Sequence, residues 1–274
     1  AYTTQPVCGP ARAGLFTGTY PHTNGMLGNC MALSQQSLTI GQRLSRAGIH
    51  AAYIGKWHLD GGDYFGDGIC PDGWDNEYWY DMRNYLDELE SDKDRERSRK
   101  LETALEGDGI GEEFTYGYRC TKRALDFMEK YKDEDYFLVV SYDEPHHTFL
   151  APKSYYEPFY KPYLQKANQH MDFSKLPDHI KVWHEKYLEI QGGNGDGCAV
   201  GLLGSNSFID SQIGRVLEGA EKNAEEALVL YPSDHGDAQG SHGIHAKGPA
   251  MYEEITNIPV SYTHLRAHET PEHL

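Results

Sequence analysis

The sequence is poor in cysteine, has no long apolar run and lacks an excess of positive charge. Its five cysteines are scattered singly, without the C-x-x-C spacing of zinc ribbons or the density of a disulfide scaffold. No segment approaches the roughly 20 apolar residues of a membrane-spanning helix. The formal net charge of −17 opposes binding to nucleic acid or to an anionic membrane, because both would be repelled. We therefore expect neither as a partner.

The residues that are present suffice for a buried core. Hydrophobic residues make up 39% of the 274 positions and aromatic residues 12%, which fits one large domain or two small ones. Apolar periodicity alternates between helical and extended patterns, so an α/β fold with a helix-covered sheet is expected. The expected helices are 11–17, 37–47, 121–131 and 204–223, and the expected strands are 51–54, 136–141 and 227–231. Residues 60–76 and 151–200 are expected as connections, and 87–109 as a solvated helix or excursion.

A cysteine stands at the start of the first expected helix, in the run PVCGPARAGLFTG (residues 6–18). Cys8 would lie at the positive end of the helix dipole, with Arg12 one turn further on. Pro10 fits a first helical turn, where its missing N–H costs nothing. A lone cysteine in such a place is more often a buried residue near a helix cap, so this feature needs support from the rest of the chain.

Polar side chains also follow two expected strands, where open α/β sheets place their sites. The tetrapeptide GKWH, with Lys56 and His58, follows the strand 51–54, and DEPHH, with His146 and His147, follows the strand 136–141. Taken separately, the first could be solvated polar groups at a strand end. The paired histidines could be a metal site, a surface feature or packing residues.

A third polar segment follows the expected strand 227–231. It begins with SDHGD, which contains Asp234 and His235, and continues to Lys247 in AKGP. An Asp-His pair is an ordinary strand ending when it stands alone. The Asp- and Gly-rich stretch 60–75 lacks the spacing and the closing Glu of a calcium loop, and GNGDG at 193–197 has no preceding strand, so it is no dinucleotide fingerprint.

Together these four segments resemble, in order, the signatures of the type I sulfatases, over about residues 1 to 260. The resemblance implies an alkaline-phosphatase-like α/β/α sandwich with a mainly parallel central sheet, incomplete in this chain. It implies that Cys8 is oxidised to formylglycine by a maturating enzyme and that Arg12 helps to hold the aldehyde hydrate. The other catalytic residues that it implies are Lys56, His58, His146 and Lys247.

The same resemblance implies a metal site made by Cys8, Asp234 and His235. Oxygen donors suit Ca²⁺, and Mg²⁺ or another divalent ion is the alternative. The departures from the family pattern are Ala11 for serine, Ile49 for Tyr or Val, Ala51 for Ser or Thr, and Thr148 for proline. The last departure leaves open which histidine, His146 or His147, faces the site.

The implied function is hydrolysis of sulfate esters, with a sulfated glycan or an aryl sulfate as substrate. Two alternatives stay open: a phosphonate or phosphate ester hydrolase of the same superfamily, and a non-catalytic binder of sulfated glycans. The aromatic stretches 74–85 and 155–163 could line a sugar site, although packing explains any one of these rings as well.

The ends of the sequence carry their own expectations. The family has a strand with two adjacent aspartate ligands before the cysteine, and only seven residues precede Cys8. We therefore expect a partial catalytic domain at 1–259 that binds metal poorly. Residues 260–274 resemble a translated sequencing adapter, which predicts a non-native tail and a microbial source. The compartment stays open between a bacterial periplasmic or secreted location and the cytoplasm.

Overall fold

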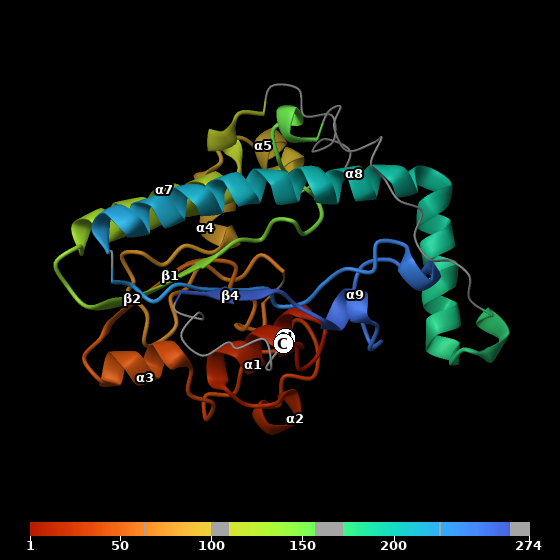
Figure 1. The fold of residues 1–274 in the computed structure, drawn as a ribbon, viewed down its shortest axis with the longest axis horizontal. Helices are drawn as coiled ribbons and strands as arrows, with labels where there is room; N and C mark the ends of the chain where they lie inside the picture. The colour runs from red at the N-terminus through yellow and green to blue at the C-terminus, as the bar shows by residue number, and fades with distance from the viewer. Residues whose placement is uncertain (63, 100–109, 157–171, 225, 264–274) are drawn as a thin grey trace, which may run out of the picture.

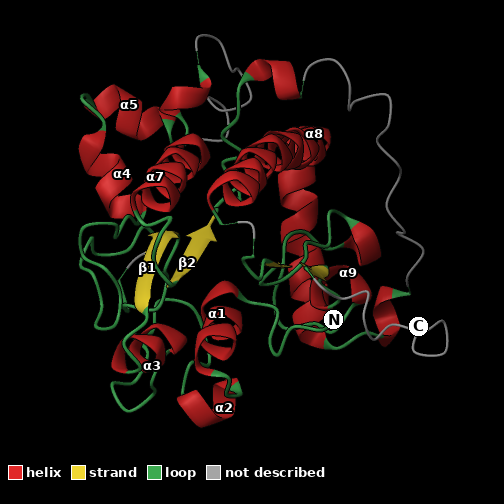
Figure 2. Cartoon of the chain, turned by 60° about the vertical axis from the view of Figure 1, so that its left-hand side comes forward, coloured by secondary structure: helices red, strands yellow, loops and turns green. Residues whose placement is uncertain are grey.

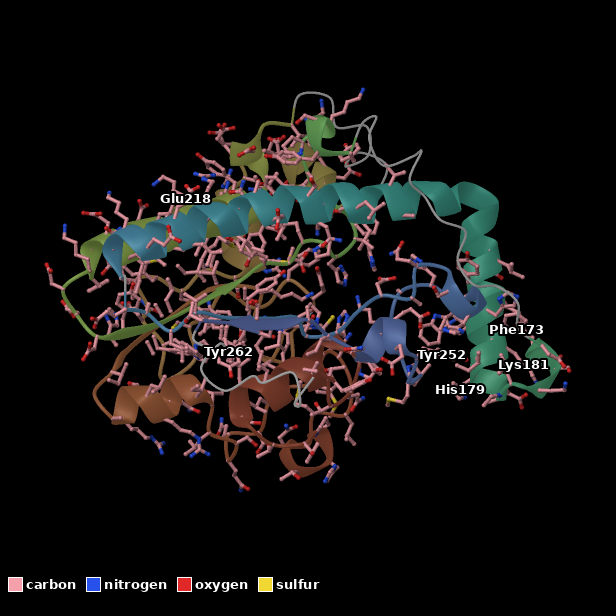
Figure 3. The ribbon with its side chains drawn as sticks, in the orientation of Figure 1. Phe173, His179, Lys181, Glu218, Tyr252 and Tyr262 are labelled. Carbon is pink, nitrogen blue, oxygen red and sulfur yellow. The ribbon has the colours of Figure 1, made fainter. Side chains whose placement is uncertain are left out.

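The computed structural model describes the chain apart from residues 63, 100–109, 157–171, 225 and 264–274, and apart from the side chains of 190–198. At its centre two parallel strands, β1 (His50–Gly55) and β2 (Tyr136–Ser141), pair in register from His50 opposite Tyr136 to Gly55 opposite Ser141. Helices cover both faces of this pair (Figure 1; Figure 2). The α/β prediction with parallel strands between helix layers is confirmed.

The two faces of β1 contact different helices. Tyr53 packs with Phe16 of α1 (Cys8–Thr17) in one apolar cluster, on the side where α3 (Ile40–Arg46) also lies. Ile54 packs with Tyr85 of α4 (Met82–Glu88) and with Cys120 of α7 (Tyr116–Lys130) in another cluster. Because both faces are covered, β1 is a continuous apolar run rather than an alternating one.

The longest helix, α8 (Asp178–Asn223), lies along α7 and forms two runs at a steep angle (Figure 1). A separate antiparallel pair joins β3 (Leu230–Pro232) to β4 (Val260–Tyr262). The remaining short elements are α2 (Pro21–Asn24), α5 (Asp92–Arg97), η1 (Glu112–Phe114), η2 (Lys153–Tyr155), η4 (Phe173–Lys175), η5 (Ser241–Gly243) and α9 (Glu253–Thr256). Within the described residues no helix is long and apolar enough to cross a bilayer.

Several boundaries differ from the sequence prediction for identifiable reasons. The second predicted helix begins at Ile40 rather than Ser37, because Thr39 and Gln42 form a capping box. The expected strand 227–231 is shorter and lies at Leu230–Pro232, with Leu230 and Tyr231 exposed. Residues 260–262 form β4, and their assignment to a non-native tail stays a prediction.

The expected connection over 151–200 is wrong from residue 178 onward, where α8 begins. Ile180 is buried in one cluster with Ile244 and Ile255, and the Trp183 indole N–H donates to the carbonyl of His245 (2.9 Å). These long-range contacts stabilise the helix. The sequence pattern does not predict it, because the glycine-rich run 192–197 lowers the helix propensity of this segment.

Candidate active site

The site lies where β1 and β2 end, opposite the N-terminus of α1. Gly55 closes β1 with a φ of +124°, and a Cβ atom there would lie 2.0 Å from the carbonyl oxygen of Ser141. Only glycine therefore allows the two strand ends to approach. The next amide, that of Lys56, donates to the same carbonyl (2.8 Å). This junction directs Lys56 from one strand and Asp143 from the other to the same edge.

Lys56 is 4% exposed, and its ammonium group lies between the carboxylate of Asp143 and the thiol of Cys8. Its Nζ lies 3.0 Å from Oδ1 of Asp143 and 3.9 Å from Sγ of Cys8. Burial alone would lower the pKa of Lys56, but the charges of Asp143 and Cys8 outweigh it and raise that pKa. The structure therefore holds the ammonium group of Lys56, buried, beside Cys8.

His58 is buried with both ring nitrogens unpaired among the described residues. Its φ of +59° lies in the left-handed region, which non-glycine residues seldom adopt and which often marks functional sites. The ring lies close enough to Cys8 to contribute to lowering the pKa of that thiol. A buried imidazole without a partner costs free energy, so its nitrogens fit a polar group that is bound there during function.

Of the two adjacent histidines, His146 is the one that faces Cys8. It contributes to lowering the pKa of the Cys8 thiol, and its Nδ1 lies 2.6 Å from the carbonyl oxygen of His147. The His147 side chain lies on the side of Lys247: burial, then the charges of His146 and Lys247, lower the pKa of His147. The structure thus places the ring of His146 nearer to Cys8, and its role in the reaction stays a prediction.

The segment after β3 closes the other side of Cys8. His235 places Nε2 3.1 Å from Sγ of Cys8, while its Nδ1 lies 2.8 Å from the carbonyl oxygen of Gly236. Burial opposes protonation of this ring, but the contact with Cys8 and the charge of Asp234 raise the pKa of His235. Lys247 lies near enough to oppose that shift by its positive charge.

Arg12 joins the two sides of the site from α1. Arg12 is 6% exposed. Its Nε donates to the carbonyl of Trp57 (2.9 Å), and its Nη2 donates to the hydroxyl of Tyr53 (2.7 Å), to the carbonyl of Lys56 and to Oγ of Ser141. Its Nη1 lies 3.5 Å from Oδ2 of Asp234. In this structure Arg12 therefore orders the strand ends around Cys8, one helical turn away.

Cations and imidazole rings surround Cys8, which is 1% exposed, and the carboxylates of Asp143 and Asp234 offset the charges of Lys56 and Arg12. Burial raises the pKa of a thiol, but the charge of Lys56 and the nearby imidazoles of His146, His235 and His58 outweigh it, so the pKa of Cys8 is lowered. Cations and donors that stabilise a thiolate there would also stabilise an oxyanion.

A divalent cation fits part of this arrangement. Among the described residues, Cys8, Asp234 and His235 bring one potential ligand atom each within 4.8 Å of one another. A hydrogen bond from Nδ1 of His235 to the Gly236 carbonyl would leave Nε2 free to ligate, which is the usual arrangement of a metal-binding histidine. The carboxylate of Asp234 is a suitable oxygen donor for a hard ion.

Asp60, Asp67 and Asp81 form a second group in which one potential ligand atom from each residue lies within 4.8 Å of the others. Their carboxylates accept backbone N–H groups within their own loop: Asp60 from Gly62 and Asp67, and Asp81 from Gly68. This loop is therefore closed by its own carboxylates, as Asp- and Gly-rich turns often are.

Two residues of the site were not singled out by the sequence. Asp143 pairs with Lys56, and Tyr64 donates its hydroxyl to Asp143. Asp143 lies inside the DEPHH segment, three positions before His146, so its place after a strand was a usable signal. Tyr64 lies in the Asp- and Gly-rich stretch and has no periodic pattern around it; only the folded loop brings it to the site.

Comparison with known proteins agrees with this fold. The sequence model of the family described as "Sulfatase" matches residues 1–260. The chain therefore belongs to the sulfatase family, whose members form an α/β fold of the alkaline-phosphatase-like type.

Among particular proteins, the chain is 42% identical to the uncharacterized sulfatase YidJ of Escherichia coli strain K12 over 270 residues. That match covers 95% of this chain and 54% of the relative, so the chain spans about half of the relative's length. Two solved structures share the fold. One, in complex with D-glucosamine-2-N,6-O-disulfate, has a TM-score of 0.67 at 19% identity and covers 96% of this chain and 62% of that chain. The other is the phosphonate monoester hydrolase of Agrobacterium radiobacter, with a TM-score of 0.68 at 16% identity. This match covers 95% of this chain and 59% of that chain.

Proposed function

We propose that this chain carries the reaction centre of a sulfuric ester hydrolase that uses a formylglycine made from Cys8. The observation that carries the proposal is the surrounding of Cys8: the buried cation of Lys56 lies 3.9 Å away, Nε2 of His235 lies 3.1 Å away, and the unpaired ring of His58 is nearby. A buried residue with so many positive or donating neighbours fits an anionic tetrahedral group bound in front of it.

This arrangement reconciles an acidic protein with an anionic substrate. The net charge of −17 would repel a sulfate ester at long range. At the site, however, the cations of Lys56, Arg12 and Lys247 gather around Cys8, and the burial of Lys56 and Arg12 strengthens their interactions with a bound anion even though Asp143 and Asp234 lie beside them. Local charge rather than net charge therefore governs binding.

The chain's own residues divide the work of the reaction. Lys56 and His58 would bind sulfate oxygens, with Lys247 approaching from the other side. When present, formylglycine supplies a hydroxyl nucleophile, and a divalent metal would favour its deprotonated form. His58 and His146 are the candidates to donate a proton to the leaving oxygen, since both lie beside Cys8.

We propose Ca²⁺ as the metal, held by Asp234, His235 and the modified residue 8. The family in general implies a divalent metal and formylglycine. The choice of Ca²⁺ rests on the carboxylate of Asp234, and Mg²⁺ is the alternative because it too prefers oxygen ligands.

We propose a sulfated glycan as the substrate. The support is the structural neighbour that holds a disulfated glucosamine. A phosphonate ester is the alternative, because the phosphonate monoester hydrolase shares the fold with a similar TM-score. A pure glycan binder would need neither an oxidisable cysteine nor an unpaired histidine beside it.

The test is to express the full-length protein with a formylglycine-generating enzyme and to measure peptide masses around residue 8. The expected result is conversion of the thiol to an aldehyde, together with faster hydrolysis of an aryl sulfate than of an aryl phosphonate. Cys8→Ala should abolish turnover, and Cys30→Ser, at an exposed cysteine, is the matched control. Faster phosphonate hydrolysis would favour the alternative, and an unmodified, inactive protein would favour the binder.

A further inference from the structure

Tyr64, in the loop after β1, contacts four groups of the candidate site. Its hydroxyl donates to Oδ1 of Asp143, and its ring centroid lies 4.4 Å from Nζ of Lys56. The same ring stacks on His146 at 4.7 Å with an interplanar angle of 30°, and meets His58 edge-on at 5.8 Å. One side chain thus touches the cation, its counter-ion and both candidate proton donors.

The loop that carries Tyr64 is fixed at both ends. Asp60 accepts the amide of Gly62 at 3.1 Å, and Asp81 accepts the amide of Gly68 at 2.9 Å. Gly66 has a φ of +84°, and a Cβ atom there would lie 2.6 Å from Oδ2 of Asp81. The Asp- and Gly-rich composition therefore has a structural role: it folds a tight loop that holds Tyr64 against the site.

The hydroxyl of Tyr64 affects how strongly Asp143 holds Lys56. Burial and the charge of Asp143 raise the pKa of Tyr64 well above its usual value, so the phenol stays a donor. Burial opposes ionisation of Asp143, but the charge of Lys56 outweighs it, with further help from His146 and the Tyr64 hydroxyl, so the pKa of Asp143 is lowered. The carboxylate is stabilised from two sides, and Lys56 need not satisfy it alone.

We propose that Tyr64 is a positioning residue for the sulfatase reaction: its hydroxyl shares the charge of Asp143, which leaves Lys56 available to a sulfate group, and its ring fixes the orientation of His146. This inference rests on the proposed function, since it concerns the same site. It assigns separate effects to the two parts of the side chain. The hydroxyl acts on sulfate binding through Lys56, and the ring acts on proton transfer through His146.

Two variants distinguish the effect of the hydroxyl from the effect of the ring. Tyr64→Phe removes the hydroxyl and keeps an aromatic ring, whereas Tyr64→Leu removes both. In the full-length protein matured to formylglycine, Y64F should raise KM for an aryl sulfate and Ki for inorganic sulfate about 3- to 10-fold, the usual size of one hydrogen bond, with kcat within about twofold. Y64L should in addition lower kcat, so that kcat/KM falls about 100-fold. The matched controls are Y155F and Y155L, because Tyr155 also donates to a carboxylate, that of Glu112 (2.7 Å), while packing on Phe208.

Unchanged KM, kcat and Ki in both Tyr64 variants would overturn the inference. Equal losses in the Tyr155 variants would also overturn it, because they would show a general effect of removing such a tyrosine. If Y64L fails to fold by circular dichroism, Y64F still decides through KM and Ki. A wild-type protein that carries formylglycine and hydrolyses no sulfate ester would contradict the proposed function instead, and the comparison of sulfate affinity between wild type and Y64F would still decide the role of Tyr64.

Discussion

The two halves of the candidate site are held in the structure by different means. The strand-edge half, made by Lys56, His58, Asp143 and His146, follows β1 and β2, and β1 is buried from Ala51 to Gly55. The C-terminal half, made by Asp234, His235 and Lys247, follows β3, whose Leu230 and Tyr231 are exposed.

The two halves differ in what packs directly behind the site. The strand-edge half depends on apolar clusters on both faces of β1, whereas the C-terminal half packs on α8 through Ile244 and Ile255 and reaches Cys8 and Arg12 through the polar side chains of His235 and Asp234. Substitutions in the first half should therefore cost both stability and activity. Substitutions in the second half should cost mainly activity.

The largest expected loss of stability is that of Gly55→Ala in the strand-edge half. The new Cβ would collide with the Ser141 carbonyl at 2.0 Å, and the φ of +124° is rarely adopted by alanine. We expect the free energy of unfolding, measured by urea denaturation, to fall by more than about 4 kcal/mol. Gly18→Ala is the control: its φ is +68° but a Cβ there meets nothing within 4 Å, so about 1–2 kcal/mol is expected. Equal losses would show that the clash at the strand ends is unimportant.

Arg12→Met should have the next largest effect, because Arg12 links both halves. The change leaves the carbonyl of Trp57 without its buried donor, removes one of the donors to the carbonyl of Lys56, and takes the arginine partner from Asp234. Breaking a buried charge network in this way typically costs about 3–5 kcal/mol. Thermal and urea unfolding measure it, and Arg46→Met, at an exposed helical position, should change stability by less than about 0.5 kcal/mol. A loss as small as that of the control would mean that the halves are not coupled through Arg12.

Glu144 should give the strand-edge half a pH-dependent stability. Burial, then the charge of Asp143, raise the pKa of Glu144 to about 7 from 4.5. Between these values the folded protein binds more protons than the unfolded one, so its stability is full below pH 4.5 and falls as pH rises through 7. The expected total loss by pH 8 is about 3 kcal/mol, and Glu144→Gln should remove it. Urea unfolding from pH 5 to 8 tests this, with Glu113→Gln, at an exposed glutamate, as the control that keeps the wild-type slope.

The fold was predictable where local sequence determines structure. β2 coincides with the predicted strand 136–141, and β1 extends the predicted strand 51–54 by one residue at each end, because both are short apolar runs bounded by polar residues. The first half of α8 was not predictable, since Ile180 and Trp183 are held by residues more than 60 positions away. Periodicity carries no information about such contacts.

The candidate site shows the same division. Motifs that follow strand ends predicted Lys56, His58 and His235, and the structure brings these residues together near Cys8, because strand ends place polar residues at one edge. Tyr64 escaped prediction because its position depends on a loop closed by carboxylates, whose composition resembles that of any solvated turn. The choice between His146 and His147 likewise needed the structure, since both follow the same strand.

The smallest expected change in stability belongs to the C-terminal half, in Lys247→Met. Lys247 is partly exposed and influences His235 and His147 through its charge, so we expect the free energy of unfolding to change by less than about 0.5 kcal/mol. In the matured protein, however, kcat/KM for an aryl sulfate should fall about 100-fold, as when one donor to a developing anion is removed. Lys222→Met, at an exposed position on α8, should change neither quantity. A large loss of stability in Lys247→Met would show that the Lys247 side chain also holds the fold. Unchanged kcat/KM would remove Lys247 from the site. The predicted combination, a large loss of kcat/KM with little loss of stability, requires that a polar side chain can be essential for turnover while contributing little to the fold.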